Sequence, residues 1–239
     1  MKNSKVILVT GSSRGIGADL VRNFAKRGFS VVINYSKSEK EANVIYREIC
    51  QATDPRFVML AKADVSKRTE VKAMFDEVVK YFGRIDALIC NAGINIDGPF
   101  LQMSDEQWHR VIDANLTGMF ICAQEFAFHY RGDMGHIITI SASTGIQGRK
   151  NGCNYCSAKG GVFALTKCLA LELAPIIRVN CVVPGRINTE ELMTRLELHN
   201  KQNYDSLVSR IPLGRLGAPY EVFEVAEFII ESTSFITGQ

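Results

Sequence analysis

Long apolar runs are missing from this sequence of 239 residues. No segment approaches the roughly 18 uninterrupted apolar residues that a membrane-spanning helix needs. The first residues also lack the apolar stretch and small-residue cleavage site of a signal peptide. A content of 46% hydrophobic and 22% charged residues is ordinary for a globular protein. We therefore expect a soluble, cytoplasmic protein with no membrane partner.

Charge of one sign is also scarce. The formal net charge is only +3, and the sequence contains neither a block of Lys and Arg nor a basic stripe interleaved with aromatic residues. These absences argue against a nucleic-acid partner and favour a small molecule.

Histidines and cysteines do not occur at metal-ligand spacing. The pair Cys153-x-x-Cys156 has neither a second pair nor suitably spaced histidines to complete a zinc site, so we expect no metal. The seven cysteines, an odd number mostly inside apolar runs, indicate buried thiols in a reducing compartment. Cys153 and Cys156 flank Tyr155, where they are either a redox-sensitive pair or two small residues in a tight turn.

Linkers, repeats and low-complexity tracts are absent, so we expect one domain over residues 1–239. Short β-rich runs alternate with amphipathic segments, and these runs are apolar throughout, as strands buried on both faces are. The pattern predicts an α/β fold, a single doubly wound parallel sheet of the Rossmann type with helices on both faces. The expected strands are residues 6–10, 30–34, 57–62, 87–90, 136–141 and 179–183.

Helices are expected between these strands, over residues 15–27, 38–50, 67–82 and 155–174, with another beginning at Ser104. Two of them open with a capping box, Ser38-x-x-Glu41 and Ser104-x-x-Gln107. The helix over residues 155–174 is apolar around much of its circumference, which favours burial against both the sheet and a second subunit. Residues 186–214 are the least regular stretch and are expected to form a lid or specificity loop.

A glycine-rich turn, Thr10-Gly11-Ser12-Ser13-Arg14-Gly15-Ile16-Gly17, follows the first strand and opens a helix. Such a turn lets backbone N–H groups approach a pyrophosphate. Its spacing matches neither the commonest dinucleotide fingerprint nor a P-loop. The same residues satisfy the G-x-S-x-G of a serine hydrolase, but the last histidine, His199, lies in the irregular stretch and not after a strand, which argues against that class.

The second strand ends in Asn34-Tyr35-Ser36-Lys37, without the carboxylate that would take the ribose hydroxyls of NAD. Lys37 and Arg14 instead suit a 2′-phosphate, so we expect NADP(H). Asp64, after the third strand, is suited to an adenine amino group, and Asn91-Ala92-Gly93, after the fourth, allows close approach to the backbone.

Tyr155 and Lys159 are four residues apart on an expected helix, so they share one face. A nearby ammonium favours the phenolate, and lowering the pKa of a phenol from about 10 to about 7 requires roughly 4 kcal/mol. One cation about 4 Å away at intermediate dielectric is of that order. The pair is therefore a candidate acid/base for a carbonyl or an alcohol.

Six motifs occur together in a fixed order along the chain, and through them the sequence resembles the short-chain dehydrogenase/reductases over nearly its whole length. The motifs are Thr10-Gly11-x-x-x-Gly15-x-Gly17, Asp64, Asn91-Ala92-Gly93, Asn115-Leu116-Thr117-Gly118, Tyr155-x-x-x-Lys159 and Pro184-Gly185. Within the family it looks most like the β-ketoacyl-acyl-carrier-protein reductases, because of Asn91-Ala92-Gly93-Ile94-Asn95 and Ile211-Pro212-Leu213-Gly214-Arg215-Leu216-Gly217.

The resemblance implies a homotetrameric, NADP(H)-dependent oxidoreductase that reduces a carbonyl, such as that of a 3-oxoacyl thioester in fatty acid biosynthesis. Tyr155 would be the general acid, Lys159 would lower its pKa and hold the nicotinamide ribose, and Asn115 would anchor a water that relays protons to Lys159. Ile187 and Thr189 would face the nicotinamide carboxamide. The full set of expected cofactor-binding residues is Gly11, Ser13, Arg14, Gly15, Ile16, Gly17, Asn34, Tyr35, Ser36, Asp64, Val65, Asn91, Ala92, Gly93, Tyr155, Lys159, Ile187 and Thr189.

The sequence departs from the family at Ala142, thirteen residues before Tyr155, where the family has a catalytic serine. That serine normally donates a hydrogen bond to the substrate carbonyl, and the loss of one such donor reduces transition-state stabilisation by about 3 kcal/mol. Three explanations stay open. A bulge at the strand end brings Ser143, or less directly Ser141, into the site; a water or a substrate group substitutes; or the protein is a nucleotide-binding relative with weak or no catalysis.

Two further departures concern the substrate and the assembly. The basic residue that carrier-protein reductases present before the sixth strand is missing, while Arg186 is either a contact for an anionic substrate or a solvated loop cation. Family members also continue after Ile236-Thr237-Gly238 with one more strand, whereas this sequence ends at Gln239. The resemblance therefore leaves open a sheet that is one strand short.

Overall fold

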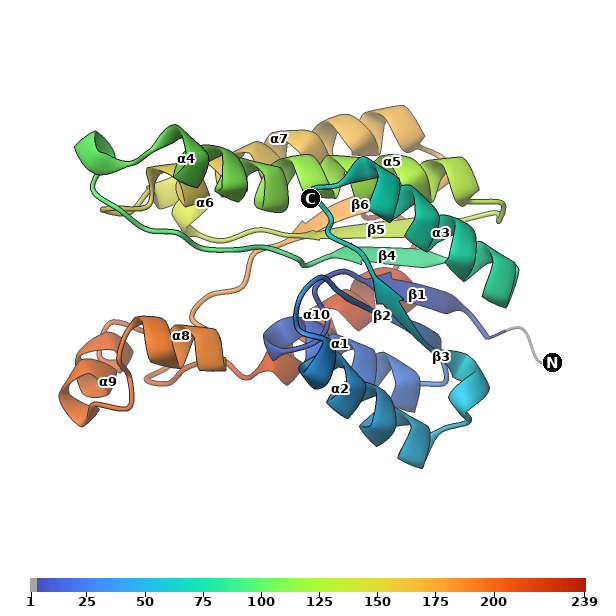
Figure 1. Cartoon of the computed structure of the whole chain (residues 1–239), viewed down its shortest axis with the longest axis horizontal. Coiled ribbons are helices and arrows are strands. Elements are labelled where there is room, and N and C mark those ends of the chain that lie inside the picture. Colours follow the sequence, from blue (N-terminus) through green and yellow to red (C-terminus); the bar gives the residue numbers. More distant parts are fainter. Residues whose placement is uncertain (1–3) are drawn as a thin grey trace.

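Six strands form one parallel sheet in a computed structural model that describes residues 4–239. Their order across the sheet is β3-β2-β1-β4-β5-β6, which confirms the predicted fold class (Figure 1). The direction of winding reverses between β1 and β4, the switch point where such sheets bind ligands. The strands are β1 (Val6–Val9), β2 (Ser30–Tyr35), β3 (Val58–Lys62), β4 (Ala87–Cys90), β5 (Gly135–Ile140) and β6 (Ile177–Val182). Met1, Lys2 and Asn3, where no signal peptide is expected, lie outside the described residues.

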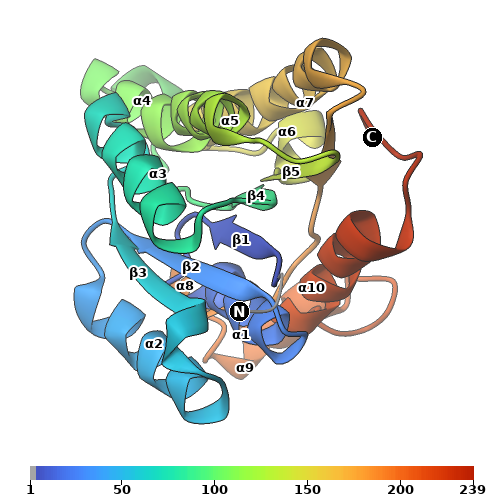
Figure 2. The same ribbon diagram turned by 90° about the vertical axis from the view of Figure 1, so that its right-hand side faces the viewer.

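Helices cover both faces of the sheet (Figures 1 and 2). They are α1 (Gly15–Lys26), α2 (Glu39–Ala52), α3 (Arg68–Phe82), α4 (Asp105–Ile112), α5 (Gly118–His129), α6 (Thr144–Gln147), α7 (Cys153–Leu173), α8 (Glu190–Arg195), α9 (Lys201–Val208) and α10 (Pro219–Glu227). Short helical turns add η1 (Pro55–Phe57), η2 (Phe100–Gln102), η3 (Asp113–Thr117) and η4 (Phe228–Ser232). In the described part of the chain, no helix is both long enough and apolar enough to cross a membrane.

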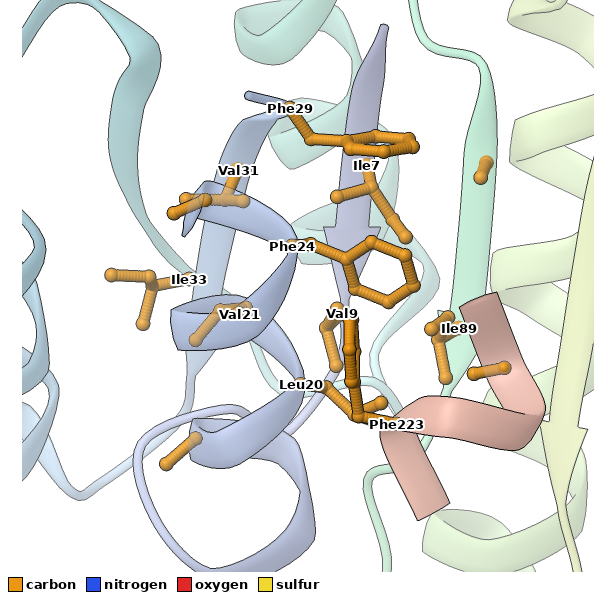
Figure 3. Packing of buried hydrophobic residues seen from close by; sticks show 14 of the residues in the cluster. Ile7, Val9, Leu20, Val21, Phe24, Phe29, Val31, Ile33, Ile89 and Phe223 are labelled. Atoms are coloured by element: carbon orange, nitrogen blue, oxygen red, sulfur yellow. The ribbon is translucent and has the colours of Figure 1, made fainter. Parts of the chain in front are cut away.

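The core has two halves, one on each face, because successive side chains of a strand point to opposite sides. On β1, Ile7 and Val9 pack under α1 and α10, whereas Val6 and Leu8 pack on the other side, under α3, α5 and α7. In the first half, the Phe24 ring lies edge-on against Phe29 and Phe223, at centroid distances of 5.1 and 5.0 Å (Figure 3).

Only one of the two predicted capping boxes forms. The Ser104 hydroxyl accepts from the N–H of Gln107 at 3.2 Å, and the Gln107 side chain accepts from the N–H of Ser104 at 3.0 Å. At the start of α2 the Ser38 side chain makes no capping hydrogen bond. The prediction there is wrong because Ser38 has φ −87° and ψ 58°, away from the extended conformation that directs a capping hydroxyl into the first turn.

The stretch over residues 186–214 is more regular than its sequence suggests. It contains α8 and α9, which lie apart from the sheet at one end of the molecule (Figure 1). Leu192, Leu198 and Leu216 form a small apolar cluster of their own there. Helices of 6 and 8 residues are too short to show a clear apolar period and depend on tertiary packing, which is why the sequence does not reveal them.

The last described residues run beside β6. The N–H of Gly238 donates to the carbonyl of Val179 at 2.7 Å, and the carbonyl of Gln239 accepts from the N–H of Cys181 at 2.7 Å. The outer edge of β6 is thus partly paired by this segment.

Candidate active site

The glycine turn between β1 and α1 is held in place by two asparagine side chains. Asn34 Oδ1 accepts from the N–H of Gly11 at 3.0 Å, and Asn91 Nδ2 donates to the carbonyls of Thr10 and Gly11 at 2.9 and 3.1 Å. Gly11 has φ +62°, and a Cβ there would lie 2.8 Å from Ala92 Cα. Only glycine fits this position, so the turn after β1 and the turn after β4 pack backbone to backbone.

Asn34 and Tyr35, at the end of β2, are both buried. The Asn34 side chain is 1% exposed, and its Nδ2 also donates to the carbonyls of Ala61 and Ala63. The ring of Tyr35 is packed in the core. The Asn34 side chain thus supports the turn, and Ser36, the next predicted cofactor residue, is half-buried.

The N-terminus of α1 has the donors that a pyrophosphate needs. No side chain caps the helix and its first turn contains no acid, so the positive end of the helix is not neutralised locally. Arg14 is exposed at this end, while Ser13 is buried and Ile16 packs against the core. At Gly17 a Cβ would lie 2.5 Å from the carbonyl oxygen of Gly11, so the helix starts directly against the turn.

Asp64 and Val65 follow β3 at the same edge of the sheet. Asp64 Oδ1 accepts from the N–H and the hydroxyl of Ser66, at 3.0 and 2.7 Å, which fixes the carboxylate and leaves Oδ2 without a hydrogen-bond donor from residues 4–239. The Val65 side chain packs on Gly118, where a Cβ would lie 2.8 Å from Val65 Cγ2.

The segment after β6 reaches back to the glycine turn. Ile187 pairs with Gly217 and packs against the core under α1. A Cβ on Gly15 would lie 3.6 Å from Thr189 Cγ2, while the Thr189 hydroxyl accepts from the N–H of Leu192 and caps α8. The structure thus brings two distant parts of the predicted cofactor site together.

Lys159 is buried on α7, with 4% of its surface exposed. Its Nζ donates to the carbonyl of Ile140, at the end of β5, at 2.7 Å. Burial lowers the pKa of Lys159 to about 8. A Cβ on Gly93 would lie 3.9 Å from Nζ, so the turn after β4 leaves space next to the ammonium.

Asn115 lies in the π-helical turn η3 between α4 and α5 and is fully buried. Its Nδ2 donates to the carbonyls of Ile94 and Val111, each at 2.8 Å. Its Oδ1 faces Gly93, where a Cβ would lie 2.3 Å away, and has no hydrogen-bond partner in the described chain. A buried, unpaired amide oxygen is a suitable acceptor for a bound water.

The electrostatics of Tyr155 differ from the prediction. Burial raises the pKa of Tyr155 above its ordinary value, Glu191 adds to the rise, and the cations that oppose it are Arg149 and Arg195. Lys159 Nζ lies 5.8 Å from the ring centroid and is bonded to Ile140 instead. Lys159 is thus not among the cations that lower the pKa of Tyr155 in this geometry, in contrast to the expectation.

The strand end near Ala142 has no bulge. β5 and β6 pair regularly up to Ile140 opposite Val182. The Ser141 hydroxyl donates to the carbonyl of Lys159 at 2.8 Å, so it is not free to bind a substrate. Ser143 directly precedes α6 at its N-cap position, is half-buried, and makes no side-chain hydrogen bond within residues 4–239. Of the two serines, Ser143 is the one that remains a candidate donor.

Among residues 4–239, no group of three or more His, Cys, Asp or Glu side chains is arranged to hold a metal. Cys153 and Cys156 are both free thiols, and Cys153 Sγ lies 3.4 Å from Met103 Sδ.

Comparison with known proteins identifies the family. A family model described as short chain dehydrogenase matches residues 5–199. The chain belongs to the short-chain dehydrogenase/reductase family. It is 37% identical to the 3-oxoacyl-acyl-carrier-protein reductase FabG of Staphylococcus aureus, over 100% of this chain and 96% of that protein. It is 36% identical to the 3-oxoacyl-acyl-carrier-protein reductase of Synechocystis, over 99% and 94%.

A similar solved structure supports the same family assignment. The short-chain dehydrogenase/reductase of Brucella melitensis, titled a glucose/ribitol dehydrogenase, superposes with a TM-score of 0.90 at 30% identity, over 98% of this chain and 92% of that one. Family membership makes the protein an oxidoreductase that uses a nicotinamide cofactor.

One site residue of this short-chain dehydrogenase/reductase was not predicted from the sequence. Arg149 places its guanidinium carbon 5.0 Å from the centroid of the Tyr155 ring. Its position in the sequence was suggestive, because Arg149 precedes the helix that carries Tyr155 and lies between two glycines, Gly148 and Gly152. Nothing in the sequence, however, fixes the direction of its side chain.

Proposed function

We propose that this protein is an NADP(H)-dependent reductase of a carbonyl in a 3-oxoacyl thioester, such as 3-oxoacyl-acyl-carrier protein. The observation that carries the proposal is the convergence of Tyr155, buried Lys159 and the unpaired Oδ1 of Asn115 at one edge of the sheet. The glycine turn with its free helix N-terminus lies at the same edge. The two carrier-protein reductases that match over 96% and 94% of their length support the substrate class.

The bound nicotinamide would supply the hydride to the carbonyl carbon. Tyr155 donates its proton to the carbonyl oxygen, and its raised pKa keeps the phenol protonated at neutral pH, as an acid requires. Lys159, with a pKa of about 8, can hold or release a proton in the working range. Asn115 Oδ1 holds a water that passes protons toward Lys159.

For the cofactor, we propose NADP(H) over NAD(H). Arg14 and Lys37 are exposed cations near the end of β2, where no carboxylate competes for the 2′-phosphate. Arg14→Ala should weaken NADPH binding by about tenfold and leave NADH binding unchanged, measured by fluorescence titration. Lys80→Ala, at an exposed position on α3, is the control for the loss of a surface cation. Equal losses for both cofactors would contradict the preference.

NADPH oxidation with an acetoacetyl thioester tests which group donates a hydrogen bond to the substrate carbonyl. If Ser143 donates to the carbonyl, Ser143→Ala should lower kcat by about 100-fold. If a water fills the space at Ala142, Ser143→Ala should have little effect and Ala142→Ser should raise kcat. An unchanged rate in both variants would remove either serine position from the mechanism.

A second candidate function follows from the same residue. Ala142, which stands where the family has a serine that donates to the substrate carbonyl, favours a nucleotide-binding relative with weak or no catalysis. Tight NADPH binding without turnover of any member of a carbonyl panel would support this candidate over the reductase.

We also propose a homotetramer. Large apolar side chains are exposed on α5 and α7, among them Phe120, Phe128 and Leu171, and a second copy of the chain would cover them. Light scattering in solution tests the assembly, and a monomer at micromolar concentration would contradict it.

A further inference from the structure

Arg149 is fixed against the face of the Tyr155 ring. Its guanidinium carbon lies 5.0 Å from the ring centroid. Its Nη2 donates to Asn95 Oδ1 at 2.7 Å and to Asp97 Oδ1 at 2.5 Å. Two residues that follow β4 thus hold a cation over the side chain that carries the proton.

The placement of Arg149 depends on a tight fit. The side chain is only 18% exposed, and a Cβ on Gly152 would lie 2.6 Å from Arg149 Nε. That Nε is buried and has no hydrogen-bond partner in the described chain. An unpaired buried donor costs stability, so folding alone does not account for the position of this side chain.

Arg149 is also the cation that lowers the pKa of Tyr155 most. The charged and titratable groups around Tyr155 are Arg149, Cys156, Lys159, Arg186, Glu191 and Arg195. Arg195 is paired with Glu191 at 2.6 Å, so these two largely cancel. Lys159 is directed to Ile140. Asp97 is paired with Arg149 at 2.5 Å and holds the guanidinium in place.

We propose that Arg149 is a positioning residue for Tyr155: it stabilises the phenolate that remains when the phenol gives its proton to the substrate oxygen, and Asn95 and Asp97 hold it there. This inference rests on the proposed role of Tyr155 as the acid. An opposite charge within about 4–6 Å favours the ionised form, and face-on contact with the ring adds a cation–π attraction.

The test observes Tyr155 directly, without turnover. The protein, which has seven tyrosines, is labelled with 3-fluorotyrosine, and Tyr155→Phe identifies the Tyr155 resonance by its loss. Fluorine NMR then gives the pH at which Tyr155 ionises. In Arg149→Gln we expect this pH to rise by about one unit. Arg149→Lys, which keeps a charge, should recover part of the shift, and Lys150→Gln, an exposed neighbour, should leave the titration unchanged.

The kinetic readout is the alkaline limb of the reduction rate, which should move in the same direction in Arg149→Gln. A titration of Tyr155 that stays within about 0.2 units of wild type in both Arg149 variants would overturn the inference. If Arg149→Gln does not fold, as judged by circular dichroism, the comparison of Arg149→Lys with wild type decides. A clear shift of the Tyr155 titration in a protein without turnover would instead refute the proposed reductase function and keep the role of Arg149.

Discussion

Within residues 4–239, two cationic side chains are buried, Lys159 on α7 and Arg178 at the start of β6, and their hydrogen bonding differs. Each is about 5% exposed or less. Lys159 Nζ has one hydrogen bond, to Ile140. Arg178 donates to the carbonyls of Ile229, Thr233 and Ile236 at 2.7 to 2.8 Å and contacts His136. Bonds from both terminal nitrogens to three carbonyls make Arg178 a structural clamp for the C-terminal segment, although its Nε has no partner in the described chain. The single bond of Lys159 leaves its ammonium able to exchange a proton.

The largest difference between the two cations should appear in the reduction rate of Lys159→Met. Reduction by this variant should fall at least about 1000-fold, because the proton route is lost. Its melting temperature at pH 7 should be unchanged or higher, because burial of the charge destabilises wild type. Thermal unfolding and NADPH oxidation measure the two quantities, and a clearly lower melting temperature would contradict the contrast.

The pH dependence of the Lys159 contribution has a definite sign. The pKa of Lys159 is lowered to about 8 in the folded protein, from 10.5. Between these values the unfolded chain is protonated and the folded protein is not, so stability rises with pH across this window. The change is on the order of 3 kcal/mol. Lys159→Met should lack this rise, which denaturant unfolding between pH 7 and 10 will show.

Arg178→Met should show the opposite pattern. Three buried carbonyls lose their donor, so the free energy of unfolding should fall by about 4 kcal/mol. The folded fraction should keep its kcat/KM, because Arg178 lies at the start of β6, away from the site. Lys167→Met, an exposed position on α7, is the control for the loss of a cation. A drop in kcat/KM without a loss of stability would reverse the assignment.

The last predicted effect is a loss of stability at acid pH, which comes from His136, a neighbour of Arg178. Burial is the main cause, and the charge of Arg178 the second, that lowers the pKa of His136 to about 4. As pH falls from about 6.5 to 4, the unfolded chain takes up a proton that the folded protein does not, so stability is lost. The loss is up to about 3 kcal/mol. His136→Gln should reduce it and His109→Gln, at an exposed position, should not, as measured by urea unfolding at pH 4 and 7.

The sheet and the position of the site could be predicted from the sequence because both follow from local rules. Apolar strands between amphipathic helices predict a parallel sheet, and parallel strands place Gly11, Asp64 and Gly93 at one edge. The direction of a side chain within such strands is a different matter. Asn34 lies in a strand buried on both faces, so no alternation indicates where its amide points, and the N–H of Gly11 decides it.

Features that depend on a distant partner, or on the exact backbone conformation of one residue, could not be predicted. Arg149 reaches the Tyr155 ring only because Asp97 and Asn95 bind it across the chain. Ser38 satisfies the capping pattern, yet its backbone conformation prevents the bond. In these cases the geometry after folding decides the role of the residue.

The π-helical turn η3 has a consequence for protein engineering. It interrupts what would otherwise be one long helix from α4 to α5, and Asn115 lies in its centre. Deleting one residue there would restore the regular α-helical register, a change that a consensus or stabilisation design would favour. The repaired helix would turn Asn115 away from Gly93 and Ile94. A thermostable variant obtained in this way would keep its fold but would no longer direct the unpaired Oδ1 of Asn115 toward Gly93.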